Sequence, residues 1–123
     1  MATLIVCIKR RSDFTHAEFS RYWGEVHAPL LLSCKEFTRH LRSYVQYRPH
    51  EEGSPVAAMF GHSAAYDGVA VLTFHDADAL VAAFKEPKYL EYVRPDEPRF
   101  IDLENCLPFV LEGTAIKADT APR

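Results

Sequence analysis

The sequence has no long hydrophobic run, and neither sign dominates its charge. No apolar stretch approaches the roughly 20 residues that a membrane-spanning helix needs. The apolar residues at the N-terminus come before the first basic residues, which reverses the order found in a secretory signal. We therefore expect a cytoplasmic protein without a membrane segment.

Cysteine, glycine and histidine are placed in ways that exclude several kinds of site. The chain has three widely spaced cysteines, Cys7, Cys34 and Cys106. An odd number without a C-x-x-C pair predicts neither a disulfide framework nor a zinc site. The five glycines are isolated, so no phosphate-binding loop is present, and the six histidines lack the spacing of a helical metal site. We expect no metal and no cofactor.

The balance of charges argues against a nucleic-acid partner. Lysine and arginine number 14 and aspartate and glutamate 17, which gives a net charge of -3. Nucleic-acid binding needs a clustered basic surface that neutralises phosphates. With 48% hydrophobic and 25% charged residues in 123, the chain has the composition of a globular protein. We expect one domain over residues 1–113, followed by a tail over residues 114–123.

Periodic patterns predict four strands and a well-defined first helix. Apolar residues alternate with polar ones, or form short runs, at residues 3–10, 39–47, 69–75 and 107–111. The first helix begins at Thr15, which forms a capping box with Glu18 in the sequence T-H-A-E. Pro29 should kink or interrupt this helix, because proline disfavours a helical conformation in the residue before it, and residues 30–37 can resume the helix.

A second helix follows the third strand. Asp76 or Asp78 can cap it, and it should end near residue 85. Its inward-facing residues are expected to be Leu80, Val81 and Phe84. Residues 49–67 hold glycine, serine and proline and predict a long loop, in which residues 56–60 pack as a short insert.

The order strand, helix, strand, strand, helix, strand predicts an α+β protein of the ferredoxin-like split βαβ class. Such a fold has a four-stranded antiparallel sheet with two helices on one face. The predicted strands carry apolar residues toward both faces, so the face without helices should be an interaction surface. Pairing two such sheets would close a barrel, and we therefore predict a homodimer.

His27 is the leading candidate for chemistry. It follows Trp23 by four residues, so the two side chains share one helix face. A neutral imidazole accepts or delivers a proton near neutral pH. On spacing alone, a histidine that caps the helix C-terminus is an equal alternative. Asp96, Glu97 and Asp102 form an acidic cluster that would orient His27 or act as a base, or else belong to a solvated turn.

Tyr44 lies on the second predicted strand and has two readings. Its hydroxyl would bind a ligand, or its ring would pack between the sheets of a dimer.

Three segments resemble the EthD family of the dimeric α/β-barrel superfamily. They are F-x-x-Y-W-x-x-x-H-x-P at residues 19–29, F-x-x-P-x-Y at residues 84–89, and D-E-x-x-F-x-D at residues 96–102. The resemblance implies the ferredoxin-like dimer. It also implies an acid/base role for His27, supported by the acidic positions Asp96, Glu97 and Asp102. Substrate-binding residues on this basis are Tyr22, Trp23 and Phe100, and Tyr44 joins them from its place on the second predicted strand.

The family's known members suggest several activities. EthD-like proteins are associated with bacterial degradation of ethyl tert-butyl ether, and similar fungal domains act as dehydratases or decarboxylases. Neighbouring families include cofactor-free monooxygenases, muconolactone isomerases and haem-handling proteins. Our first hypothesis is a cofactor-independent enzyme that acts on a small apolar or aromatic, oxygenated compound. The alternatives are a dimeric ligand-binding or accessory protein for a partner oxygenase, and haem binding through one histidine.

Overall fold

A computed structural model describes residues 1–50, 54–61 and 66–117 of the chain. Its four strands are β1 (Ala2–Ile8), β2 (Leu41–Tyr47), β3 (Gly68–Phe74) and β4 (Leu107–Leu111). The α-helices are α1 (His16–Tyr22), α2 (Ala28–Ser33), α3 (Lys35–Thr38), α4 (Pro55–Met59) and α5 (Ala77–Lys85). Two π-helical segments, η1 (Trp23–His27) and η2 (Tyr89–Val93), and two 3₁₀ segments, η3 (Arg94–Arg99) and η4 (Leu103–Asn105), complete it. No helix in these ranges is long and apolar enough to cross a membrane.

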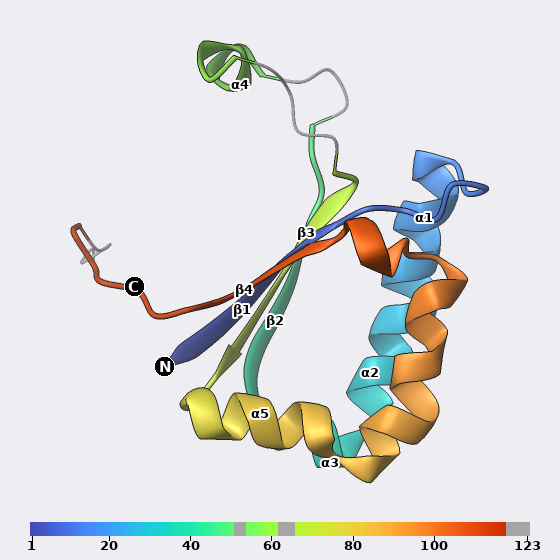
Figure 1. Ribbon diagram of the computed structural model, residues 1–123, viewed down its shortest axis with the longest axis vertical. Helices are drawn as coiled ribbons and strands as arrows, with labels where there is room; N and C mark the ends of the chain where they lie inside the picture. Colours follow the sequence, from blue (N-terminus) through green and yellow to red (C-terminus); the bar gives the residue numbers. More distant parts are fainter. Residues whose placement is uncertain (51–53, 62–65, 118–123) are drawn as a thin grey trace.

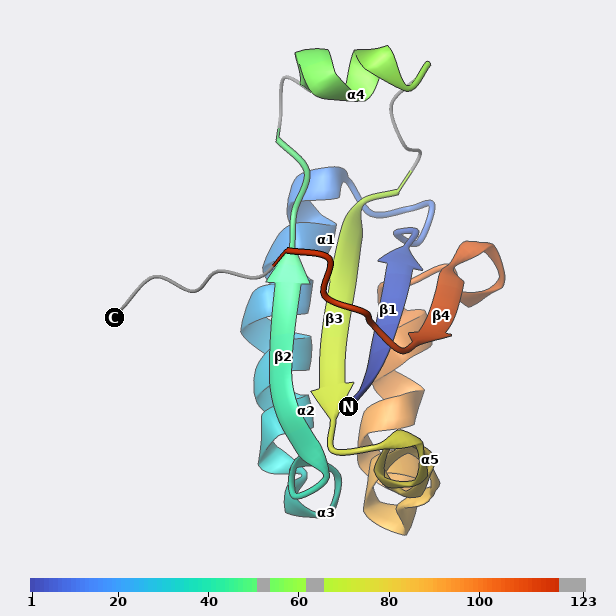
Figure 2. The ribbon, with the colours of Figure 1, turned by 90° about the vertical axis from the view of Figure 1, so that its left-hand side faces the viewer.

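The strands form one antiparallel sheet in the order β2-β3-β1-β4. Seen edge-on in Figure 1, the sheet has α1, α2 and the segments of residues 89–99 on one side only. The other face is turned toward the viewer in Figure 2. This is the predicted α+β, ferredoxin-like arrangement, and β1 is the central strand that its two apolar faces indicated.

The first helix begins as the sequence predicts. The Glu18 amide donates to the Thr15 hydroxyl at 3.1 Å, and the Thr15 amide donates to the Glu18 carboxylate at 2.8 Å. No break occurs at Pro29, and the chain is helical beyond it, as one alternative predicted. The helix continues through residue 33, because the chain forms a π-helical turn at η1 in which the Ala28 amide donates to the Trp23 carbonyl. That wider turn absorbs the loss of the proline N–H without breaking the helix.

The second predicted helix is α5, and it settles which aspartate is the cap. Asp76 accepts the Ala79 amide at 2.7 Å. Leu80 is buried as expected, but Val81 is 46% exposed and Ala83 is fully buried. Val81, predicted to face inward, is therefore only partly covered, since consecutive helical residues point about 100° apart and residues 80, 83 and 84 share one side.

The two sheet faces differ sharply in what covers them. Tyr44 pairs with Leu72 and lies on the helix-covered face, so the alternative in which it packs between two sheets is wrong. The opposite face, which we call the open face, carries large side chains that remain 40–55% exposed. They are Val45, Tyr47, Leu107, Phe109 and Leu111.

The long loop contains one short helix, α4, which Ser54 caps through the Val56 amide. Figures 1 and 2 both show α4 beyond one end of the sheet. Val56, Met59 and Phe60 are 61–84% exposed, so the expected packing of residues 56–60 is not observed. Residues 51–53 and 62–65 of the predicted loop, His62 among them, lie outside the described residues.

Candidate functional site

A cavity of about 510 Å³ lies between the sheet and its helices. The strands contribute apolar side chains of the helix-covered face to its wall, namely Leu4, Val6, Ile8, Ala70 and Leu72. Trp23, His27 and Leu31 come from η1 and α2, and Tyr44 comes from β2. The size and the largely apolar wall are those of a site for a small organic molecule.

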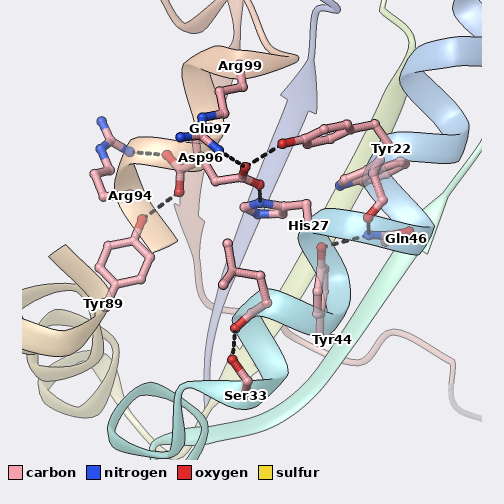
Figure 3. Close-up of polar contacts among 12 residues, drawn as sticks. Tyr22, His27, Ser33, Tyr44, Gln46, Tyr89, Arg94, Asp96, Glu97 and Arg99 are labelled. Carbon is pink, nitrogen blue, oxygen red and sulfur yellow. Dashed lines mark hydrogen bonds and ion pairs between the residues drawn. The ribbon is translucent and has the colours of Figure 1, made fainter. Parts of the chain in front are cut away.

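His27 and Asp96 form a buried pair at this cavity (Figure 3). The His27 Nδ1 and Asp96 Oδ2 atoms are 2.9 Å apart, and the two residues are 7% and 4% exposed. Since a carboxylate accepts, Nδ1 carries the hydrogen, so in the neutral ring the lone pair lies at Nε2. Within the described chain no side chain or backbone group bonds to Nε2, so this atom is available to a ligand.

Asp96 is held by more than His27. The Tyr22 hydroxyl donates to Asp96 Oδ1 at 2.5 Å, and Arg99 Nη1 lies 3.9 Å from the same oxygen. Burial, followed by the adjacent Asp96, raises the pKa of Tyr22, so its phenol stays a donor. These contacts fix the carboxylate that orients His27.

Two aromatic residues of the family motifs occupy different places. Trp23 lines the cavity beside His27. Phe100 is fully buried, with its ring centroid 4.9 Å from that of Tyr22 and 5.0 Å from that of His27. Tyr22 and Phe100 therefore support the His27–Asp96 pair from behind, and neither belongs to the cavity wall.

The other two predicted acids are separated by the fold. Glu97 lines the cavity, where it accepts the Tyr89 hydroxyl at 2.7 Å and Arg94 Nη1 at 2.5 Å. Burial, and then the Glu97 charge, raises the pKa of Tyr89 well above its ordinary value. Asp102 accepts from Asn105 at 2.7 Å and is not part of the cavity wall.

Tyr44 presents a polar group on the sheet side of the cavity. Its oxygen accepts from Gln46 Nε2 at 2.9 Å, and the same nitrogen donates to the Trp23 carbonyl at 3.0 Å. Burial raises the pKa of Tyr44. The phenol therefore keeps its proton and has it available for an oxygen of a ligand.

The structure adds residues that the sequence patterns did not single out as functional. Lys85, Tyr89, Arg94 and Cys106 also line the cavity. Only Tyr89 carried a signal, because it ends the F-x-x-P-x-Y segment. No group of three or more potential metal ligands occurs in the ranges that the structure describes.

The sequence model of the EthD domain matches residues 11–104. This chain belongs to the EthD family. The match takes in the predicted residues of the site, from Tyr22 through Asp102, so the resemblance in the sequence motifs is confirmed.

Solved structures of relatives support the fold. An ethyl tert-butyl ether degradation (EthD) family protein from Bacillus halodurans has a TM-score of 0.65 at 18% identity, with 93% of this chain and 99% of that chain covered. A Dabb family protein with a ferredoxin-like fold from Mesorhizobium loti gives 0.61 at 17%, covering 93% and 97%. HapK from Hahella chejuensis gives 0.57 at 17%, covering 97% and 100%. No curated protein matches the chain. At these identities the likeness shows a common fold.

Proposed function

We propose that this EthD-family protein is an enzyme that transfers a proton to or from an apolar, oxygenated ring compound bound in the cavity. The observation that carries the proposal is the buried His27–Asp96 pair, which opens onto an apolar cavity of about 510 Å³. General acid–base catalysis needs a titratable group within reach of the substrate and a fixed orientation of that group.

The chemistry follows from the fixed tautomer. Nε2 of His27 takes a proton from a carbon next to a carbonyl group, and the electron pair of the broken C–H bond moves to the carbonyl oxygen. Asp96 stabilises the imidazolium that forms, as carboxylates do in other Asp–His pairs. The Tyr44 hydroxyl donates to the enolate oxygen. Glu97 is the second carboxylate at the cavity and a candidate to receive or return a proton.

The substrate decides how the enolate reacts further. Loss of a leaving hydroxyl as water gives a dehydratase, and return of the proton to another carbon gives an isomerase. Loss of carbon dioxide from a β-keto acid reaches the same enolate directly and uses His27 as the acid. A stabilised carbanion that reacts with molecular oxygen and a proton forms a hydroperoxide, and loss of water from it leaves a new carbonyl group on the oxidised carbon, which is the outcome of a monooxygenase. All four agree with a proton-transferring histidine.

Mass spectrometry of a substrate panel tests the proposal. Wild type, His27→Ala and Asp96→Asn would be incubated in air with hydroxylated polycyclic aromatics, aromatic β-keto acids, unsaturated lactones and tert-butyl ethers. We expect turnover of at least one class and a loss of about 100-fold or more in His27→Ala. The exposed His75 is the matched control, and His75→Ala should retain turnover. Equal rates in wild type and His27→Ala would contradict the role of His27.

A binding or accessory protein for a partner oxygenase is the second candidate. The largely apolar wall of the cavity favours it, because such a wall retains a hydrophobic compound with or without catalysis. Ligands retained by wild type and His27→Ala alike, with no conversion of any panel member, would support this alternative.

We also propose that the protein acts as a homodimer joined through the open face. Five large apolar side chains remain 40–55% exposed there, and they lie on the two edge strands of the sheet, β2 and β4. Burying them against the same face of a second copy would remove this surface from water.

A further inference from the structure

The exposed members of the cavity wall mark where a ligand enters. Most wall residues are buried or half-buried, but a few are solvent-exposed, and these come from α5, η3, η4 and β4. They are Val81, Lys85, Arg94, Leu103 and Pro108. We call this set the mouth.

The mouth carries positive charge. The Lys85 side chain forms no hydrogen bond or ion pair with any residue that the structure describes. Arg94 pairs with Glu97 through one nitrogen, and its side chain is still 53% exposed. The carboxylate of Glu86, the residue after Lys85, contacts Arg39 Nη2 at 2.7 Å and His40 Nε2 at 3.2 Å through its Oε1 atom.

Two cations therefore face one carboxylate, Glu97, around the mouth. Asp96 does not offset the remaining charge, because it lies behind His27 and outside the cavity wall. The deeper wall is apolar apart from His27 and the Tyr44 and Tyr89 phenols. A cavity with an apolar depth and a cationic rim fits a molecule with a hydrophobic body and an anionic end.

We propose that the ligand of this cavity is a cyclic or aromatic carboxylic acid, whose carboxylate is held at the mouth by Lys85 with help from Arg94. The proposal rests on the proposed function, since it places the ring near His27 and names the substrate class. Lys85 supplies a point charge with three donors, and the guanidinium of Arg94 has N–H groups beyond the one that bonds Glu97. The carboxylate stays partly solvated at the rim, so binding does not require full desolvation of its charge.

Calorimetric titration with a matched ligand pair tests this assignment. The probes are 2-naphthoate and 2-naphthamide, which share size and shape but differ in charge. We expect wild type to bind the acid about tenfold more tightly than the amide. The preference should fall about threefold to fivefold in Lys85→Gln and recover in Lys85→Arg. Lys88→Gln is the matched control, because Lys88 is exposed nearby but outside this cavity, and its preference should equal that of wild type.

The outcomes separate this inference from the proposed function. Equal affinity for the two probes, or a preference that Lys85→Gln leaves unchanged, would overturn the role of the mouth even if His27-dependent turnover is found. Failure of both probes to bind would also overturn it. A preference for the acid that depends on Lys85, in a protein that converts no panel member, would support the anionic ligand class. It would contradict only the proposed catalytic function.

Discussion

Single side chains in this protein are constrained by close neighbours around Trp23. The guanidinium carbon of Arg48 lies 4.8 Å from the Trp23 ring centroid, and the Phe19 ring stacks on the indole with a centroid distance of 5.4 Å. Gly68 closes the remaining side, because a Cβ built there would lie 2.6 Å from Trp23 Cζ3. The indole thus has one position, which also fixes the wall of the cavity beside His27.

Replacing Gly68 with alanine should therefore destabilise the protein. The added methyl group must displace the Trp23 ring, which is 1% exposed and tightly packed. We expect a loss of about 1–3 kcal/mol in the free energy of unfolding, measured by urea denaturation. Gly113→Ala is the control, since nothing lies within 4 Å of its Cβ position, and it should change stability by less than about 0.5 kcal/mol. Equal effects of the two substitutions would refute the argument.

At the scale of whole elements, the π-helical turn η1 is the feature that shapes the site. It places Trp23 at its start and His27 at its end, both buried. A regular α-helix would carry residue 27 about 400° around the axis from residue 23, whereas a π-turn accommodates an extra residue and changes that direction. The π-helical turn thus comes directly before Pro29 and carries two residues of the cavity wall, Trp23 and His27.

The cap of α5 gives a prediction for a second element. Asp76→Ala removes the acceptor of the Ala79 amide, and we expect a loss of about 1 kcal/mol in the free energy of unfolding. Asp78→Ala is the matched control, because Asp78 is exposed in the first turn but is not the cap. Its removal should cost only a few tenths of a kcal/mol through the helix dipole. Chemical denaturation monitored by circular dichroism measures both, and a larger loss for Asp78→Ala would contradict the assignment.

Asp67 joins the end of β1 to the start of β3, and it should make stability depend on pH. Burial by itself raises its pKa, but the Arg10 amide at 2.9 Å, His16 at 3.1 Å and the Arg10 guanidinium outweigh burial and lower it below 3.8. When a carboxyl group has a lower pKa in the folded than in the unfolded state, its ionised form stabilises the folded protein. This stabilisation is fully present at pH values above the unfolded-state pKa, and it is lost as the pH falls through the folded-state pKa.

We therefore expect Asp67→Asn to cost about 1–2 kcal/mol at neutral pH. The difference from wild type should shrink as the pH falls below 3.8, measured by urea denaturation at several pH values. Asp13→Asn is the control, since Asp13 is exposed and pairs only at the surface with Arg11. A wild-type advantage over Asp67→Asn that grows in acid would be inconsistent with this account.

At the scale of the molecule, the two faces of the sheet have separate uses. The covered face and its helices enclose the cavity, while the open face displays apolar side chains to water. Because the open face lies on the other side of the sheet from the cavity, a substitution there tests the dimer without disturbing the cavity. Neighbouring residues of β4 point alternately to the two faces, as the register with β1 requires.

Phe109→Glu should convert the dimer to a monomer. A charge on the open face would be buried without a partner when two such faces pair. Sedimentation is expected to give twice the chain mass of 14.0 kDa for wild type and a single chain mass for Phe109→Glu. Val110→Glu is the matched control, because Val110 points the other way at the sheet edge and is 61% exposed. A wild-type monomer at micromolar concentration would exclude the barrel dimer.

The sequence by itself determined the strands, the capping box at Thr15 and the ferredoxin-like order, because these depend on local periodicity and short-range hydrogen bonds. It also singled out His27 and the acidic segment. It did not distinguish Asp96 from Asp102, since contacts across 69 residues depend on how η1 and η3 pack. The face chosen by Tyr44, the wider helical turn before Pro29, and the union of Lys85 and Arg94 at one mouth were decided only by the tertiary structure. Each depends on the register of a strand, the winding of a helix or the approach of distant elements, and none of these is encoded in neighbouring residues.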